Sequence, residues 1–221
     1  MRWIVDYFRY AWYDLQHARQ VKSRYYQDPE YSVLDRALLK KYIFRSPYQI
    51  SKKYLKKKRE KDLYTYGETP LTTFEKMAKE VEVKPLDHVL ELGCGRGRGV
   101  FFLAHFYNCK VTGIERIPQF VKLADHVASK HKVENVSFKC GDMFEMKWPN
   151  ANVIYLYGTC LSDDEIKQVL NKVKTFPKGT RILSVSYPLI EYDDDHAFKL
   201  IKRFLVAFPW GETEAFLQVV Q

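Results

Sequence analysis

Hydrophobic positions follow two alternating periods along residues 64–221. Segments with the period of a helix lie at about 72–82, 98–107, 118–131 and 163–174. Short apolar runs between them predict strands at 87–92, 110–114, 136–140, 152–157 and 180–186. Two of the helix starts carry the capping-box pattern, Thr72 with Glu75 and Ser162 with Glu165. This alternation is typical of an α/β domain, a parallel sheet with helices on both faces.

The C-terminal end departs from the alternation. KLIKRFLVAF and TEAFLQVVQ have the character of two strands, joined by a tight turn that contains Pro209, Trp210 and Gly211. We therefore expect an antiparallel hairpin to close the parallel sheet.

The amino-terminal quarter has a different pattern. An apolar and aromatic stripe of helical period runs through residues 3–15. Such a helix either packs on the domain or on another subunit, or it lies on a membrane surface. Residues 52–61 then hold seven Lys and Arg. They form either a solvated helical face or a patch that attracts phosphates or acidic protein surfaces.

Charge divides the chain at about the same place. The 221 residues suffice for one full domain with an appendage, and the net charge is +9. Residues 1–63 hold sixteen Lys and Arg against seven Asp and Glu, whereas residues 64–221 hold twenty of each. The charge break and the Gly/Pro-containing turn at 66–70 predict a basic helical N-terminal extension, residues 1–63, and a neutral domain, residues 64–221.

The cysteine spacing and the hydropathy limit the classes of protein to which this chain can belong. Cys94, Cys109, Cys140 and Cys160 form no CxxC pair and have no histidine at a metal-ligand interval, so no metal site is expected. Their apolar surroundings favour reduced thiols in a cytosolic protein. Charged residues interrupt the amino terminus, and no run of about 18 apolar residues occurs, so we expect neither a secretory signal nor a spanning segment. The predicted location is the cytoplasm.

The candidate chemistry lies at the end of the first predicted strand. HVLELGCGRGRGV places Gly93, Gly95 and Gly97 at a strand-to-helix turn, where backbone N–H groups can approach a ligand. A dinucleotide fingerprint needs the same turn to cradle a pyrophosphate. Glu91, two residues before the first glycine, would repel that anion and instead favours a cationic amino group.

Two further acids follow the next strands. Glu115 ends the second strand and is placed to accept hydrogen bonds from ribose hydroxyls. Asp142 follows the third strand and could accept from an adenine amine, with Met143 and Phe144 packed against the ring. The carboxyl ends of parallel strands share one edge of a sheet, where such folds bind ligands. Ammonium, ribose and adenine in this order describe S-adenosylmethionine.

These motifs resemble those of a known family. ELGCGRGRG, Glu115 and GDMF are similar to the first, second and third motifs of class I S-adenosylmethionine-dependent methyltransferases, over about residues 64–221. The resemblance implies a Rossmann-like seven-stranded sheet, parallel except for a terminal antiparallel hairpin.

A second segment, YGETP, narrows the resemblance. It is similar to a loop ahead of the first motif in the non-SET protein-lysine methyltransferases of the disruptor-of-telomeric-silencing type. There the loop folds over the methionine end of the cofactor, and the resemblance assigns this role to Tyr66, Gly67, Glu68 and Thr69. That family has paired asparagines after the fourth strand, where this chain has Tyr157 and Gly158. The alternative for YGETP is a turn with a helix N-cap.

The resemblance implies methyl transfer to a protein lysine, with Glu68 and Tyr157 as catalytic candidates. Tyr157, Tyr187 and Trp210 are candidates for an aromatic acceptor channel or for half-buried core. Residues Lys52–Lys61 are expected to attract an acidic or phosphate-bearing macromolecule, and a protein is favoured over RNA because few aromatics interleave the lysines. The alternatives are a methyltransferase for RNA or a small molecule, and a cofactor-binding scaffold without activity.

Overall fold

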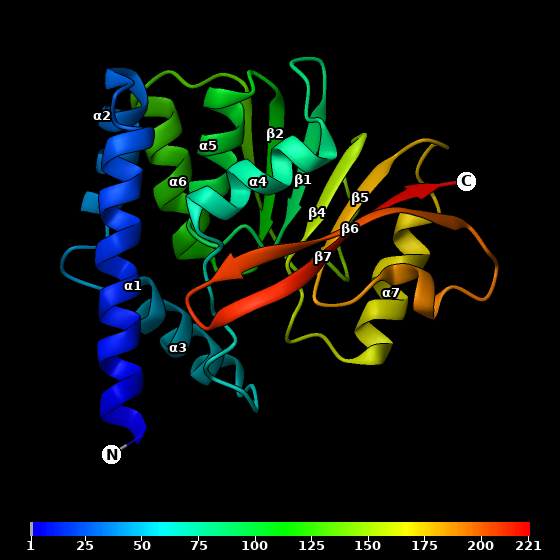
Figure 1. Cartoon of the computed structure of the whole chain (residues 1–221), viewed down its shortest axis with the longest axis horizontal. Coiled ribbons are helices and arrows are strands. Elements are labelled where there is room, and N and C mark those ends of the chain that lie inside the picture. Colours follow the sequence, from blue (N-terminus) through cyan, green and yellow to red (C-terminus); the bar gives the residue numbers. More distant parts are fainter. Residues whose placement is uncertain (1) are drawn as a thin grey trace.

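The computed structural model describes residues 2–221, with side chains from residue 12 onward, as a single sheet flanked by helices (Figure 1). The seven strands lie in the order β3-β2-β1-β4-β5-β7-β6. They are β1 (His88–Leu92), β2 (Lys110–Glu115), β3 (Val136–Cys140), β4 (Val153–Leu156), β5 (Arg181–Val185), β6 (Phe198–Phe208) and β7 (Gly211–Val220). The helices are α1 (Arg2–Arg24), α2 (Pro29–Lys40), α3 (Pro47–Lys58), α4 (Leu71–Val81), α5 (Arg98–Phe106), α6 (Pro118–Lys130), α7 (Asp163–Val173) and the 3₁₀ turn η1 (Leu189–Tyr192).

The pairing confirms the predicted mixed sheet. Strands β1 to β5 pair in parallel, and β7 pairs antiparallel with both β5 and β6. The predicted strands at 87–92 through 180–186 and the predicted helices at 72–82 through 163–174 all agree with the observed bounds to within one residue. Because parallel pairing aligns the strand ends, the carboxyl ends of β1, β2 and β3 meet at one edge.

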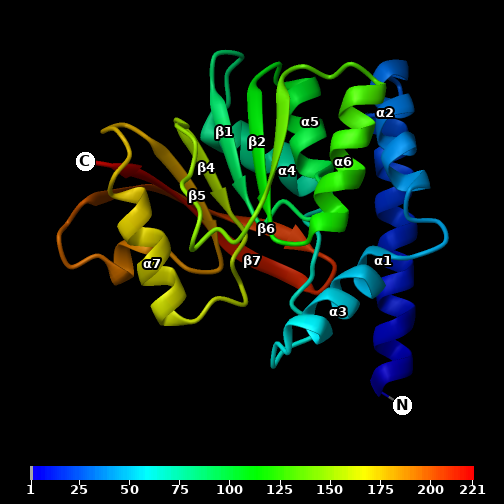
Figure 2. The same cartoon turned by 180° about the vertical axis from the view of Figure 1, so that it is seen from behind.

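Helices cover both faces of the sheet (Figure 2). On one face, α4 and α5 pack on a cluster that includes Val89, Val111 and Leu183. On the other face, α7 packs on a cluster that includes Leu90 and Ile154. The period-2 alternation along β1 therefore divides its side chains between the two cores.

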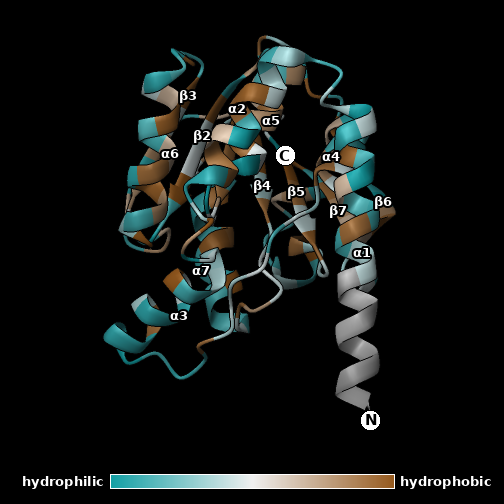
Figure 3. Ribbon diagram, turned by 90° about the vertical axis from the view of Figure 1, so that its left-hand side faces the viewer, coloured by the Kyte–Doolittle hydropathy of each residue, from teal (hydrophilic) through white to brown (hydrophobic). Residues whose placement is uncertain are grey.

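The N-terminal helices share a core with the sheet domain. Leu34 and Leu38 of α2 and Ile50 of α3 pack against Phe101 of α5 and Phe120 of α6. Figure 3 shows the apolar residues gathered between these elements, with polar residues on the outer faces of α3 and α4. The division of the chain at residue 64 stays a prediction, but these helices bury apolar surface against the rest of the chain.

A buried ion pair joins α2 to α5. The guanidinium of Arg98 donates to both oxygens of Asp35 at 2.8 and 2.7 Å. The Tyr26 hydroxyl donates to the same carboxylate at 2.8 Å. Burial opposes ionisation of Asp35, yet its hydrogen bonds with Arg98 and Tyr26 hold its pKa below the usual value. This pair anchors the N-terminal helices beside the glycine loop, since Arg98 directly follows it.

One of the two predicted capping boxes is wrong. Helix α4 begins after Pro70 with no side-chain cap, and Glu75 instead accepts from the Tyr25 hydroxyl at 2.7 Å. The Ser162–Glu165 box at the start of α7 is confirmed, because the bonds in both directions are present. The stripe at residues 3–15 lies mostly outside the described side chains. Its described members Trp12 and Leu15 are exposed.

Helices α4 and α5 approach each other at Gly99. A β-carbon on Gly99 would overlap the ring of Phe74. We expect Gly99→Ala to lower the free energy of unfolding by about 1–3 kcal/mol through overpacking. Thermal denaturation measures the loss, and adding Phe74→Leu should restore part of it if the clash is the cause. A Gly99→Ala protein as stable as wild type would contradict the close approach.

Candidate cofactor site

The glycine loop after β1 has a backbone that favours glycine. Gly93, Gly95 and Gly97 have φ values of +73°, +55° and +81°, a region that side chains with a β-carbon rarely adopt. Gly97 ends the loop as the residue before α5, and a β-carbon there would overlap the Phe138 ring. The loop therefore brings its backbone to the carboxyl edge of the sheet with no side chain in between.

Glu91 is buried behind this loop. It is 5% exposed, and its Oε2 atom has no hydrogen-bond partner within the described part of the chain. Burial, and to a smaller extent the charge of Glu115, hold the pKa of Glu91 well above its usual value. An unpaired buried carboxyl is costly, and a bound cation would relieve that cost.

Glu115, the last residue of β2, connects the loop to the next helix. One carboxylate oxygen accepts from the Gly95 N–H at 2.9 Å and the other from the Ile117 N–H at 2.8 Å. Burial raises the pKa of Glu115 despite these two bonds. Each oxygen retains acceptor capacity, so the carboxylate can both position the loop and receive hydroxyl donors.

A cavity of about 930 Å³ opens at this edge of the sheet. Its wall includes most of the predicted site residues: Tyr66, Gly67, Gly93, Gly95, Glu115, Asp142, Met143, Phe144 and Tyr157. Asp142 uses one carboxylate oxygen to accept from the Phe144 N–H at 2.8 Å, which fixes the turn after β3. Four predicted residues lie outside the wall, namely Glu68, Thr69, Glu91 and Gly97.

The YGET segment is held by side chains behind the cavity wall. The Tyr66 hydroxyl donates to one oxygen of Glu68 at 2.5 Å, and the Arg96 guanidinium pairs with the other. The Thr69 hydroxyl lies 2.8 Å from that of Tyr155 on β4. Gly67 packs on the ring of Tyr157, and a β-carbon on Gly67 would lie 3.7 Å from the Cε1 atom of that ring. The loop therefore lies between the glycine loop and β4.

An aromatic stack leads from the cavity to the surface. The Tyr157 and Phe208 rings stack with centroids 5.0 Å apart and planes at 27°. Phe208 stacks in turn on Trp210 at 5.3 Å and 6°. Trp210, at the hairpin turn, is 44% exposed. Tyr187 is not part of this stack, because its hydroxyl bonds to the Gly158 carbonyl and its ring packs with the α7 core.

Sequence reasoning missed one wall of the cavity. Ser51 and Leu55 of α3 line it together with the following residues Arg59–Asp62. The sequence did contain a hint of this wall, because Ile50, Ser51 and Leu55 fall at near-helical spacing at the start of the basic run. All three are buried in the structure. The high density of lysines concealed this apolar face.

Two sequence comparisons agree with this site. The sequence model of a family described as "ANTKMT methyltransferase domain" matches residues 91–196, just under half of the chain. Ajmaline N-methyltransferase of Rauvolfia serpentina is 30% identical over 118 residues, which cover 52% of this chain and 40% of that protein. The chain therefore spans less than half of the length of this curated relative.

Solved structures share the architecture. TrmN from Thermus thermophilus superposes with a TM-score of 0.62 at 14% identity, covering 70% of this chain and 50% of that one. The fold is that of a class I methyltransferase. An RNA methyltransferase from Salinibacter ruber in complex with S-adenosyl-L-homocysteine gives a TM-score of 0.56 at 24% identity, covering 70% of this chain and 94% of that one. S-adenosylmethionine is the cofactor that these comparisons support.

The residues of this class I fold suit that cofactor. The unpartnered Oε2 of Glu91 matches a cationic amino group, and the glycine loop leaves room for a close backbone approach. Glu115 and Asp142 supply acceptors on the cavity wall, and Met143 and Phe144 supply apolar surface.

Cofactor affinity should depend on pH through Glu91. Its raised pKa favours the protonated carboxyl in the free protein, and a bound ammonium favours the ionised form. Binding therefore releases a proton, and affinity should rise with pH below about 7, where an α-amino group stays charged. Calorimetry in buffers of different ionisation enthalpy measures the release. Equal affinity at pH 5 and pH 7 would contradict this assignment.

Proposed function

We propose that the chain is an S-adenosylmethionine-dependent methyltransferase that methylates the side-chain amine of a protein lysine. The main support for a lysine acceptor is the stack of Tyr157, Phe208 and Trp210, which connects the cavity wall to an exposed turn. A lysine side chain is long and narrow enough to reach a buried methyl group along such a stack. The resemblance of the YGET segment supports the same acceptor.

The cofactor, when bound, supplies a methyl group that its sulfonium already activates. The task of the chain is then to hold and align the two reactants and to exclude water. Glu91 would hold the ammonium, Glu115 the ribose hydroxyls and Asp142 the adenine amine. Tyr66, Gly67 and Thr69 would close over the methionine end.

The acceptor must lose a proton before it attacks. A lysine ammonium has an ordinary pKa of about 10.4, and an apolar aromatic surround disfavours the charged form. Tyr157 would provide that surround at the methyl group. Glu68, the other catalytic candidate, would act by holding Tyr66 and Arg96 in place beside the methionine end, because its two carboxylate oxygens are bonded to those side chains.

A nitrogen acceptor also accords with the curated relative, whose name is that of an N-methyltransferase. That name suits a small-molecule amine, and the Salinibacter neighbour is named as an RNA methyltransferase, so both acceptors stay alternatives. A cofactor-binding scaffold without activity is the third alternative.

An acidic or phosphate-bearing partner at Lys52–Lys61 and a cytoplasmic location stay predictions. Within residues 2–221, no helix combines the length and the apolar character needed to cross a membrane.

Trp210→Ala should impair transfer without impairing cofactor binding. We expect kcat/KM for the acceptor to fall about ten- to a hundredfold because the amine loses its alignment. Leu86→Ala is the matched control, since Leu86 is 99% exposed and does not line the cavity. Transfer kinetics and titration of the cofactor separate the two effects. Unchanged kcat/KM in Trp210→Ala would exclude the stack as an acceptor path.

Labelled methyl transfer into a cell lysate tests the class of acceptor. Label that is removed by protease and survives nuclease supports a protein acceptor. Nuclease-sensitive label would establish RNA, and label in the low-molecular-weight fraction would establish a small molecule. Cofactor binding with no transfer into any fraction would favour the scaffold.

A further inference from the structure

The segment from α2 to the end of α3 carries a high density of exposed basic side chains. Residues 36–59 contain ten Lys and Arg and no Asp or Glu, and all ten basic side chains are exposed. We call this set the basic face: Arg36, Lys40, Lys41, Arg45, Lys52, Lys53, Lys56, Lys57, Lys58 and Arg59. It accounts for the whole positive excess of the chain, because the remaining residues nearly balance.

The basic face is not neutralised by the chain itself. None of its members forms an ion pair with a carboxylate whose side chain the structure describes. Arg36 and Lys52 lie over the rings of Tyr26 and Tyr64, at 5.0 and 4.6 Å from the centroids. Elsewhere, buried or half-buried cations such as Arg98 and Arg181 have acidic partners. The charges of the basic face are therefore available to an external anion.

Two apolar side chains project from the middle of the basic face. Ile43 is 68% exposed and Phe44 is fully exposed, on the turn between α2 and α3. Tyr42, just before them, is buried and holds the turn against the core. Lys41 and Arg45 flank the apolar pair. Two adjacent apolar side chains at this exposure, flanked by cations, gain free energy when an apolar phase receives them.

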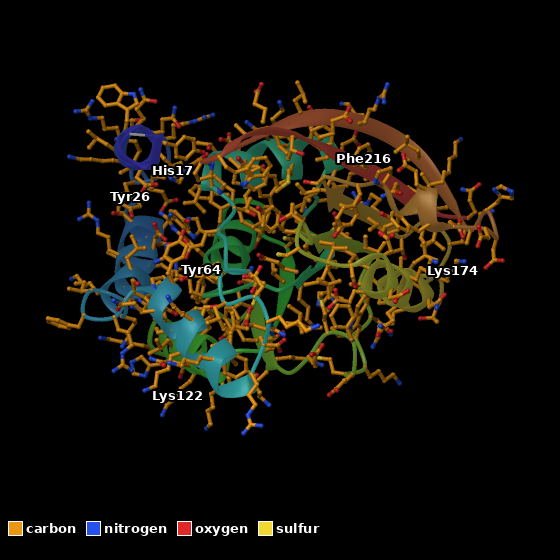
Figure 4. The ribbon with its side chains drawn as sticks, turned by 90° about the horizontal axis from the view of Figure 1, so that it is seen from below. His17, Tyr26, Tyr64, Lys122, Lys174 and Phe216 are labelled. Atoms are coloured by element: carbon orange, nitrogen blue, oxygen red, sulfur yellow. The ribbon has the colours of Figure 1, made fainter. Side chains whose placement is uncertain are left out.

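Helix α3 places this surface beside the cofactor cavity. One side of α3 lines the cavity through Ser51 and Leu55, and the five lysines of the helix are exposed to solvent. Figure 4, viewed from below, shows α3 at the lower left of the molecule. The Ile43–Phe44 turn lies at the start of this helix.

We propose that the basic face and the Ile43–Phe44 turn dock the chain on an anionic lipid bilayer. Lysines and arginines near such a surface are attracted to the phosphate and carboxylate headgroups, and the apolar pair enters the boundary between headgroups and acyl chains. Either signal alone gives weak binding, whereas the two together give stable, reversible attachment. An RNA partner would use the charges and could stack one base on Phe44, but it offers no apolar phase to the aliphatic Ile43 beside it. The proposal does not depend on the methyl acceptor.

Co-sedimentation of the full chain with lipid vesicles tests this proposal. We expect binding to vesicles of phosphatidylcholine with about 30% phosphatidylserine, and little binding to phosphatidylcholine alone. Affinity should fall as salt rises from about 0.05 to 0.5 M, because the headgroup attraction is screened. No methyl acceptor is needed, so the result is separate from the proposed activity.

Matched variants separate the two signals. Each lysine near an anionic surface contributes about fivefold in affinity, so Lys53→Ala/Lys56→Ala/Lys57→Ala should weaken binding about a hundredfold. Ile43→Ser/Phe44→Ser should weaken it about tenfold or more. The controls are Lys147→Ala/Lys178→Ala and Leu86→Ser, which remove exposed charge or apolar surface elsewhere. An unchanged cofactor-induced rise in Tm verifies that each variant is folded.

Three results would overturn the proposal. The first is equal binding to neutral and anionic vesicles. The second is full binding by either the lysine or the Ile43/Phe44 variant. The third is tighter binding of a single-stranded RNA or an acidic peptide than of anionic vesicles, which would assign the basic face to that macromolecule.

Discussion

Glu91→Gln is expected to weaken S-adenosylmethionine binding by about a hundredfold, or about 3 kcal/mol. The change removes a buried carboxylate that has no partner in the described part of the chain and therefore retains its full capacity for an ammonium. Glutamine keeps the size of the side chain, so the glycine loop should stay in place. Calorimetric titration measures the loss, and Glu134→Gln, at an exposed position, is the matched control. Wild-type affinity in Glu91→Gln would refute the assignment of the ammonium site.

The same variant should be more stable than wild type when no cofactor is bound. Glu91 has a folded pKa raised above its unfolded value, so its contribution favours folding at low pH and is lost as pH rises through the folded pKa. Glutamine has no charge to bury. The Tm of Glu91→Gln should therefore exceed that of wild type at pH 7, and the difference should vanish near pH 4. Opposite shifts in stability and in cofactor affinity distinguish this site from an ordinary structural carboxylate.

Arg98→Ala should lower the free energy of unfolding by about 3–5 kcal/mol. It leaves Asp35, whose side chain is 1% exposed, as a buried charge without its bidentate partner. Asp35→Ala should have a similar effect, because it leaves the nearly buried guanidinium unpaired. Since the pair joins α2 to the start of α5, cofactor affinity should fall in both variants. Chemical denaturation followed by circular dichroism measures the stability.

The control for the Arg98–Asp35 pair is the exposed ion pair between Arg116 and Glu60. Arg116 and Glu60 lie 3.3 Å apart with side chains 37% and 42% exposed, so Arg116→Ala should cost at most about 1 kcal/mol. The double variant Asp35→Ala/Arg98→Ala should lose less than the sum of the two single changes, because neither charge is then left alone. Additive losses would mean that the two side chains do not act as a pair.

The sheet domain was predictable because its signals are local. Period-2 and period-3.6 patterns located the parallel strands and their helices, and the C-terminal runs predicted the hairpin. The glycine loop was also predictable, because closely spaced glycines follow an apolar strand and Glu91 separates this loop from a dinucleotide fingerprint. The shared position of the three acids at one edge of the sheet was predictable as well, because parallel pairing aligns the carboxyl ends of the strands.

The parts that depend on distant partners were not predictable. Arg96 and Glu68 are 28 positions apart, and Arg98 and Asp35 are 63 apart. No periodicity within one segment carries information about such pairs. The capping pattern at Thr72 also failed for this reason, since Glu75 is engaged by Tyr25, which follows α1. Tertiary contacts here override a local preference.

The acceptor side illustrates the same limit. Tyr157 and Trp210 were recognisable as aromatics that follow a strand and a turn, but Phe208 between them was read only as part of a strand. The stack forms because β7 pairs with β5 and β6 with β7, and Phe208 at the end of β6 then reaches Tyr157 after β4. Tyr187 had the same sequence signature and lies against the other core. Strand-end position alone therefore does not decide which face an aromatic joins.

Transfer of a labelled methyl group from S-adenosylmethionine to lysine is the most direct measurement of the central claim. The labelled protein fraction of a lysate would be hydrolysed and its amino acids separated, with Glu91→Gln as the binding-impaired control. We predict that the label elutes as methylated lysine with the wild-type chain and that Glu91→Gln gives far less label at a cofactor concentration well below its weakened Kd. Label in another amino acid, in RNA or in a small molecule, or equal label with both chains, would contradict the account.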